Sequence, residues 1–355
     1  MRWDDLKLDG DEETRALPGM RDPAVVRRFD APEALDMRFY EVRAKTVLNR
    51  VPARSSMPFA WTVNPYRGCS HACTYCLARP THEYLDFDAG RDFEREIVVK
   101  VNAPERLRGD LARRARTPAA AEMVALGTNT DPYQWVESRY RLLPGVWEAL
   151  RDARVPASVL TKSPLLLRDL DLMLQVRDAA GFEAALSVPS LDERAWRSTE
   201  PHTPHPRTRL AAVAELNRVG IPTAVLAAPL MPGINDSAAQ VEALLAACSA
   251  AGAVAVRGIG LHLRGSTRQV FLEWLKDARP DLVDRYEELY RHGPYLPKAE
   301  SLRLTRSISE DERAGNRRWA PPANGPASAR FSSDRGDRPD GRGTDGRALP
   351  RPGTA

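Results

Sequence analysis

Short apolar runs alternate with helical segments between residues 55 and 290, and this alternation constrains the fold more than any other feature of the chain. Helical segments of about 10–15 residues separate the runs, a pattern that favours right-handed βαβ units and a parallel sheet. The expected strands lie at 59–63, 97–101, 123–127, 157–160, 182–188, 223–228 and 253–263. The expected helices lie at 104–116, 139–154, 165–176, 207–219, 237–250 and 267–278.

The number of units is close to six, which predicts an α/β fold with a partial (β/α)6 TIM-type barrel rather than a complete eight-unit barrel. A doubly wound open sheet is the competing architecture. No G-x-G-x-x-G follows the first strand, which weakens a dinucleotide-binding interpretation. In either architecture, polar residues at the carboxyl ends of the strands are expected to face the active site.

The two ends of the chain differ in composition from this core. Residues 1–54 are polar and contain several prolines, so we expect a partly ordered N-terminal extension. Residues 291–315 are expected to form a helical or loop extension after the core at 55–290. Residues 316–355 are rich in Gly, Pro, Arg, Asp and Ser. Such a segment buries too little apolar area to offset about 1–2 kcal/mol of backbone entropy per residue, which predicts a disordered tail.

Charge and hydropathy exclude several classes of protein. Lys and Arg number 52 against 48 Asp and Glu, so the net charge of +4 does not by itself indicate nucleic-acid binding. No run approaches the ~18–20 apolar residues that cross a bilayer. The acidic N-terminus lacks the apolar region of a signal peptide. We therefore expect a cytoplasmic protein with no membrane partner.

Three of the four cysteines fall within eight residues, at positions 69, 73 and 76, directly after the first expected strand. Tight clustering of this kind indicates metal binding or redox chemistry. A [4Fe–4S] cluster normally takes four cysteine ligands, so the C-x3-C-x2-C spacing leaves one iron without an obvious protein ligand. A structural zinc site is the alternative and needs a fourth ligand, for which His71 and Cys248 are the candidates. His71 has poor reach inside the loop, and Cys248 lies on an Ala-rich helix where cysteine usually behaves as a small apolar residue.

The segment NPYRGCSHACTYCLARPTHEY, its place after the first strand and the six βα units resemble the radical S-adenosylmethionine (SAM) superfamily. Within it, the segment is similar to an uncharacterised bacterial branch related to spore photoproduct lyase. The resemblance implies that Cys69, Cys73 and Cys76 each bind one iron of a [4Fe–4S] cluster and that the fourth iron chelates SAM. Reductive cleavage of SAM would then give a 5′-deoxyadenosyl radical that abstracts hydrogen from a substrate. Tyr75 matches the family position that lies against the adenine; loop packing is the alternative.

Further candidates for SAM contacts follow the expected strands. The segment 127–131 replaces the glycine-rich motif of the superfamily, so Thr130 and Asp131 become candidates for the SAM amino group, with a turn or helix cap as the alternative. Lys162 and Ser187 match positions that contact SAM in relatives of the photoproduct lyases. Arg209 is a candidate for the SAM carboxylate or for an ion pair with Glu200.

Two departures from spore photoproduct lyase bear on the substrate. Thr128 stands where that family has its hydrogen-donor cysteine, and Leu77 stands where it has a second tyrosine. Both argue against photoproduct repair, although nucleic acid stays open as a substrate. Five arginines in 104–116 are better explained as a charged outer helix face than as phosphate contacts. SAM cleavage requires a low-potential electron donor of the flavodoxin or ferredoxin type. A zinc- or iron–sulfur-stapled nucleic-acid-binding module, an electron carrier and a photoproduct-lyase-like repair enzyme are the alternatives.

Overall fold

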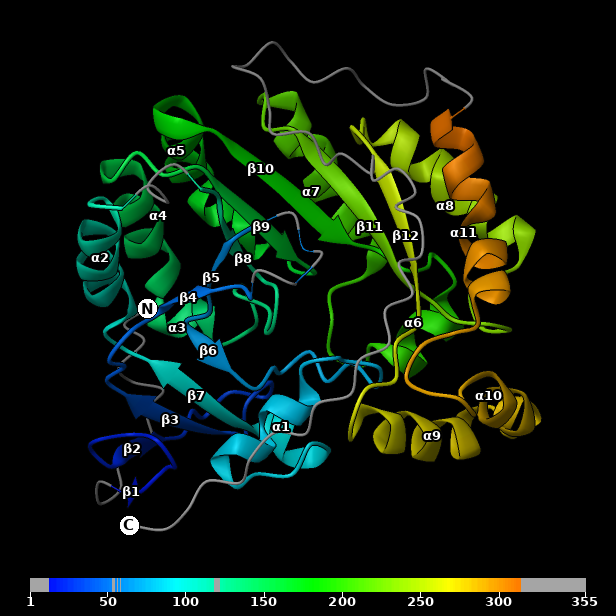
Figure 1. Cartoon of the computed structure of the whole chain (residues 1–355), viewed down its shortest axis with the longest axis horizontal. Coiled ribbons are helices and arrows are strands. Elements are labelled where there is room, and N and C mark those ends of the chain that lie inside the picture. The colour runs from blue at the N-terminus through cyan, green and yellow to red at the C-terminus, as the bar shows by residue number, and fades with distance from the viewer. Residues whose placement is uncertain (1–12, 53–54, 56, 58, 118–121, 314–355) are drawn as a thin grey trace, which may run out of the picture.

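Within the described residues, which are 13–313 apart from 53–54, 56, 58 and 118–121, six parallel strands form the main sheet of this computed structural model (Figure 1). The strand order is β12-β11-β10-β9-β8-β5-β4, and β4 pairs with β5 in the antiparallel direction. The strands are β4 (Leu48–Arg50), β5 (Trp61–Val63), β8 (Val124–Leu126), β9 (Ala157–Thr161), β10 (Phe182–Ser187), β11 (Thr223–Leu230) and β12 (Val256–Gly260). The predicted partial (β/α)6 barrel is therefore confirmed.

Helices connect successive strands and lie outside the curve of the main sheet (Figure 1). The longer ones are α2 (Ala103–Arg114), α4 (Leu142–Asp152), α5 (Leu170–Ala180), α7 (Pro206–Arg218), α8 (Ala238–Ala250), α9 (Thr267–Ala278) and α11 (Lys298–Arg313). The shorter ones are α1 (Arg91–Arg95), α3 (Glu137–Tyr140), α6 (Glu193–Thr199) and α10 (Val283–Leu289), with 3₁₀ turns at Arg79–Thr81, Glu83–Leu85, Pro164–Asp169 and Pro280–Leu282.

Alternation of side chains gives the main sheet a buried outer face. Along β9 and β10 every second residue, such as Val159 and Ala184, is buried, while the intervening residues, except the buried Ser187, are only partly buried. Trp147 of α4 is fully buried and meets Phe182 of β10 edge-on, with ring centroids 5.4 Å apart. Because successive strand residues point to opposite faces, the remaining side chains of these strands face the inside of the barrel.

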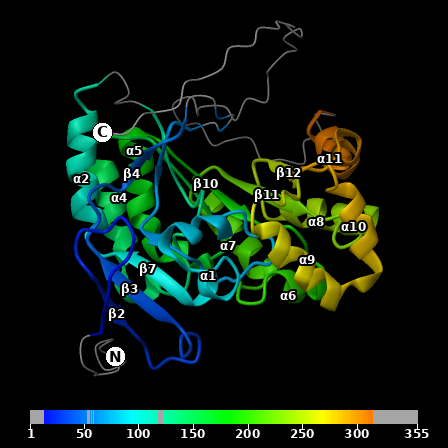
Figure 2. The ribbon, with the colours of Figure 1, turned by 60° about the horizontal axis from the view of Figure 1, so that its bottom comes forward.

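A second sheet contains the N-terminal strands, so this segment holds more structure than the sequence predicts. Its order is β1-β2-β3-β7-β6, and β3 runs parallel to β7. Figure 2 shows this sheet at one end of the molecule and α9 and α10 at the other. Its strands are β1 (Thr14–Arg15), β2 (Ala24–Arg27), β3 (Arg38–Val42), β6 (Tyr66–Arg67) and β7 (Glu96–Lys100). The predicted strand at 97–101 therefore belongs here and not to the barrel.

Three other details differ from the sequence prediction. The helix expected from residue 165 begins as a 3₁₀ turn and becomes α-helical at Leu170, because Ser163 accepts a hydrogen bond from Leu165 N (3.2 Å) and fixes a tight start. Helix α6 lies in a segment expected to be a loop and is capped by Asp192. The helix α11 forms within the expected extension 291–315 and packs along β12. The expected tail 316–355 lies outside the described residues.

In the described part of the chain, no helix combines the length and hydropathy that crossing a bilayer requires.

Among the described glycines, Gly127, directly after β8, has the least room for a side chain. Its φ is +81°, and an added Cβ would lie 1.8 Å from the Leu160 carbonyl oxygen. We expect Gly127→Ala to lower the free energy of unfolding by at least about 2 kcal/mol, more than the ~1 kcal/mol left-handed penalty alone. Gly252→Ala is the matched control, because Gly252 has φ +68° and nothing within 4 Å of the added Cβ. Denaturant unfolding measures both, and equal losses would contradict the steric explanation.

Candidate metal centre

The cysteine loop, residues 68–76, follows β6. It begins at Gly68, where there is no room for a side chain. Gly68 has φ +78°, and an added Cβ would lie 2.9 Å from Ile97 Cδ1 and 3.0 Å from the Phe93 carbonyl oxygen. Cys69 N donates to the same Phe93 oxygen at 2.9 Å. The loop is thereby pressed against α1 and β7 at the carboxyl end of β5, where a parallel barrel places its chemistry.

The three thiols of this loop are free and close enough to influence one another. Cys69 and Cys73 are buried and Cys76 is half-buried. Burial raises the pKa of the Cys73 thiol to about 12, and the neighbouring Cys76 adds to the increase. Burial likewise raises the pKa of Cys69 well above its usual value. These raised pKa values keep the Cys69 and Cys73 thiols neutral without metal, so metal binding must displace their protons.

The arrangement fits a polynuclear cluster better than a single ion. Among the described residues, no group of three or more His, Cys, Asp or Glu side chains closes around one metal ion. A zinc site would require such a group, whereas in a cluster each cysteine binds a different iron. Neither proposed fourth zinc ligand joins the thiols: His71 Nδ1 lies 3.4 Å from Asp131 Oδ2, and Cys248 is fully buried on α8.

Two hydroxyl groups in the described cysteine loop have no hydrogen-bond partner. Ser70 Oγ and Thr74 Oγ1 are buried and have no hydrogen-bond partner among the described residues. Buried polar groups in proteins are almost always paired, so two unpaired hydroxyls that lie between successive cysteines are consistent with a loop shaped to bind a further polar group. The residues present therefore fit an iron–sulfur cluster.

Two side chains that sequence reasoning missed hold the loop. The Arg79 side chain is 1% exposed and donates to the carbonyl oxygens of Cys73 (2.9 Å) and Gly90 (2.8 Å). Gln134 accepts from Ser70 N (2.9 Å) and donates to the Gly68 carbonyl (3.0 Å). The only sequence signals were proximity to the last cysteine for Arg79 and to a strand end for Gln134.

The Glu200 carboxylate contacts three of the predicted site residues. Its carboxylate accepts from the Tyr75 hydroxyl and from Arg209 Nη2 (2.6 Å), and it lies 3.9 Å from Lys162 Nζ. Burial raises the pKa of Glu200, but the charges of Arg209 and Lys162 outweigh burial and hold the pKa below its usual value. Lys162 Nζ also lies 5.6 Å from the centre of the Tyr75 ring.

Arg209 forms the ion pair that sequence reasoning proposed as one of two roles. The side chain is fully buried, and four of the five N–H groups of a guanidinium are used within the protein. Besides Glu200, the acceptors are the carbonyls of Pro204 (2.8 Å) and Ser187 (3.0 Å) and the hydroxyl of Thr203 (2.5 Å). This arrangement supports a positioning role rather than contact with a SAM carboxylate.

The remaining predicted residues also bind protein atoms. The carboxylate of Asp131 accepts hydrogen bonds from Thr161 Oγ1 (2.6 Å) and Lys162 N (2.7 Å). Burial raises the pKa of Asp131, but His71 and these two donors outweigh burial and lower the pKa to about 2. Thr130 Oγ1 donates to the Tyr66 carbonyl (3.0 Å). Ser187 Oγ donates to the Ala228 carbonyl (3.2 Å). Asp131 thus joins two strand ends to the cysteine loop, as the turn alternative implies.

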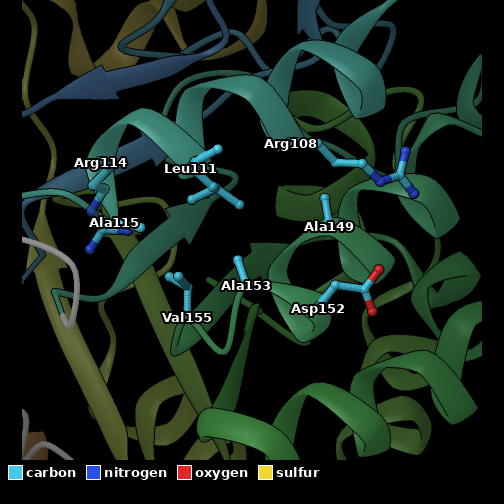
Figure 3. A pocket seen from close by; sticks show the side chains of 9 residues that line it. Arg108, Leu111, Arg114, Ala115, Ala149, Asp152, Ala153 and Val155 are labelled. Atoms are coloured by element: carbon cyan, nitrogen blue, oxygen red, sulfur yellow. The ribbon is translucent and has the colours of Figure 1, made fainter.

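A hollow of about 770 Å³ borders the cysteine loop. It lies between the loop, through Ser70 and His71, and the N-terminal segment, through Leu35 and Met37. A smaller hollow of about 290 Å³ lies between α2 and α4 (Figure 3). Val155, which precedes β9, lines the smaller hollow, so this hollow is at the amino ends of the strands and away from the thiols.

The outer face of α2 does not present a free basic surface. Arg106 and Arg113 pair with Asp110, and Arg108 lies 3.1 Å from Glu148. These ion pairs support the expectation of a charged outer helix face.

Comparison with known proteins agrees with this geometry. Residues 63–245 match the model of the radical SAM superfamily. Uncharacterised proteins of Mycobacterium tuberculosis and Mycobacterium bovis are 47% identical over 311 residues, which cover 86% of this chain and 91% of each relative. An uncharacterised protein of Methanocaldococcus jannaschii is 26% identical over 198 residues, 55% of this chain and 69% of that protein.

Among solved structures, spore photoproduct lyase complexed with a dinucleoside spore photoproduct has a TM-score of 0.56 at 16% identity, covering 77% of this chain and 79% of that one. A double variant of that lyase with bound AdoMet and the dinucleoside has a TM-score of 0.55 at 16% identity, covering 78% and 77%. These likenesses concern the fold. The family match and the mycobacterial relatives show that the chain belongs to the radical SAM superfamily.

Proposed function

We propose that this radical SAM enzyme holds a [4Fe–4S] cluster through Cys69, Cys73 and Cys76, binds SAM beside it, and abstracts hydrogen from a substrate still to be identified. The observation that carries the proposal is a loop of three free thiols at the carboxyl edge of a six-stranded parallel barrel, with two unpaired buried hydroxyls between successive cysteines. When bound and reduced, the cluster supplies the electron that cleaves SAM to methionine and a 5′-deoxyadenosyl radical.

The chain's own residues bind and orient the reacting groups and exclude water from them. Arg79 and Gln134 keep the loop backbone fixed, so the thiols stay at one place when metal arrives. Glu200 orients Tyr75 through the phenol hydroxyl, and Arg209 and Lys162 stabilise the buried carboxylate. Lys162 Nζ lies 5.6 Å from the centre of the Tyr75 ring, and its charge offsets part of the increase that burial causes in the pKa of the nearby Cys73 thiol, so we assign Lys162 to the carboxylate or ribose of SAM. A flavodoxin- or ferredoxin-type protein is the proposed electron donor.

Photoproduct repair is less well supported. Thr128 and Leu77 replace a cysteine and a tyrosine of that family, and Leu77 is 60% exposed. A hydroxyl is a far poorer hydrogen-atom donor than a thiol, so Thr128 does not replace the missing cysteine. A zinc-stapled binding module is also disfavoured, because the described residues form no closed single-ion site.

We expect Cys73→Ala to abolish both cluster retention and SAM cleavage, because one iron loses its only protein ligand. After anaerobic reconstitution, the wild-type protein should hold about four irons per chain. With dithionite and SAM it should release 5′-deoxyadenosine, measured by chromatography. Cys248→Ala is the matched control, since Cys248 is buried on α8 outside the loop. Unchanged iron content in Cys73→Ala, or wild-type protein that binds SAM and never releases the nucleoside, would refute the proposal.

We expect Lys162→Met to weaken SAM binding about tenfold, equivalent to about 1.4 kcal/mol, because it removes the cation beside Glu200 and Tyr75. Equilibrium dialysis of SAM against the reconstituted protein measures the dissociation constant. Lys276→Met serves as the control, because Lys276 is exposed on α9. Equal affinities for both variants would remove Lys162 from the SAM site.

A further inference from the structure

The inner face of the main sheet carries many small and polar side chains beside a few leucines such as Leu160 and Leu226, and no function described above uses most of them. In register, Asn49, Thr62, Ala125, Ser158 and Glu183 form one row across β4, β5, β8, β9 and β10. Ser187, Leu226 and Arg257 form a second row across β10, β11 and β12. Lys162 follows Thr161, the partner of Leu186, and is therefore level with this second row.

This face is not filled as a closed barrel interior is. In complete (β/α)8 barrels, bulky branched side chains occupy the inward positions and pack into layers. Here Thr62, Ser158, Ala185 and Ala224 take such positions and are only partly buried. These side chains therefore stay partly accessible from the inner side of the sheet, where a small molecule can reach them.

Arg257 lies on this inner face. The alternate residues Gly258 and Gly260 face α11, because an added Cβ would lie 2.7 Å from Ile308 Cδ1 and 3.6 Å from Leu304 Cδ1, respectively. The side chain of Arg257 must then project to the opposite side of β12. It is half-buried, which weakens its hydration and strengthens its attraction for an anion.

Glu183 is the acidic residue of the same face. Its neighbour Phe182 packs on Trp147 of α4, so Glu183 points inward from β10. Burial raises the pKa of Glu183 to about 7, and the charge of Arg257 lowers it in part. The two groups therefore interact electrostatically, and an anion at Arg257 would compete with the Glu183 carboxylate.

We propose that Arg257 binds an oxyanion, a carboxylate or a phosphate, of a small-molecule substrate held on this inner face. The inference rests on the proposed function. Two strand spacings of about 4.8 Å separate Ser187 from Arg257 and three separate Lys162 from Arg257, so a substrate anchored at Arg257 lies about 10 Å from Ser187 and about 15 Å from Lys162 along the same row. A planar guanidinium recognises carboxylate and phosphate groups through paired hydrogen bonds. A nucleic-acid polymer is less suitable, because it requires several phosphate contacts and this face offers one arginine.

Binding of simple oxyanions to the purified full chain tests the assignment without cluster or SAM. Inorganic phosphate is titrated by ³¹P NMR and acetate by saturation-transfer NMR. We expect Arg257→Gln to weaken binding of the preferred anion at least about tenfold, and Glu183→Gln to tighten it about threefold by removing a competing negative charge. Tighter binding of phosphate or of acetate identifies which oxyanion the substrate carries. Arg218→Gln is the control, since Arg218 is exposed on α7 and pairs with Glu215 at 2.6 Å. Equal binding by wild type, Arg257→Gln and Arg218→Gln would overturn the proposal.

A second experiment uses substrate turnover. A desalted small-molecule extract is separated on an anion exchanger, and each fraction is added to reconstituted enzyme with SAM and dithionite. The retained fraction should stimulate 5′-deoxyadenosine release by the wild type and fail to stimulate Arg257→Gln. Stimulation by the unretained fraction alone, or by single-stranded oligonucleotides alone, would contradict the assignment. Wild-type protein that releases no nucleoside under any condition refutes the proposed function instead, and the anion titration still decides the role of Arg257.

Discussion

Hydrogen bonds from two buried side chains to the backbone fix the loop that carries the three thiols, and the rest of the site depends on that restraint. Arg79 donates to the carbonyl of Cys73 in the loop and to the carbonyl of Gly90 next to α1. Gln134 joins Ser70 to Gly68. Burial raises the pKa of Cys69 and Cys73, so these two thiols stay neutral and do not repel one another before metal binds. The loop is thus shaped by the protein, and metal binding exchanges protons for iron without having to organise the backbone.

Around this loop, the buried charges serve mainly to orient other groups. Glu200 and Asp131 both lie in the interior, where an unpaired carboxylate would be costly, and each is surrounded by donors. Glu200 links Tyr75 to Lys162 and Arg209, whereas Asp131 links β9 to the cysteine loop. Removing one partner of such a buried pair leaves an uncompensated charge, so these networks fix the geometry of the site.

The strands that support the loop use their two faces differently. Their outer positions, such as Val159 and Leu186, pack on the helices and stabilise the barrel. Many of their inner positions are small or polar, and several of these side chains are only partly buried. This division explains how one sheet provides both the rigid base for the thiols and a binding surface with its own charge, Arg257.

Much of this organisation could be predicted from the chain. The C-x3-C-x2-C spacing indicated the metal chemistry, and the alternation of apolar runs and helices predicted six βα units, because both signals are local in sequence. The residues at strand ends, Asp131, Lys162 and Ser187, were correctly placed near the carboxyl edge, since parallel strands bring those ends to one side. Their partners were not predictable, because a hydrogen bond between Asp131 and Lys162, or between Arg209 and Ser187, joins segments that only folding brings together.

The sequence by itself thus determined the class of fold and the three thiols, through periodicity and spacing within short segments. Only the tertiary structure decided that Arg209 and Asp131 bind protein atoms. It also decided that the strand at Glu96–Lys100 joins a second sheet and that Arg257 and Glu183 share the inner face. The physical reason is that burial, strand register and charge pairing depend on distances between residues far apart in the chain, and no local pattern encodes those distances.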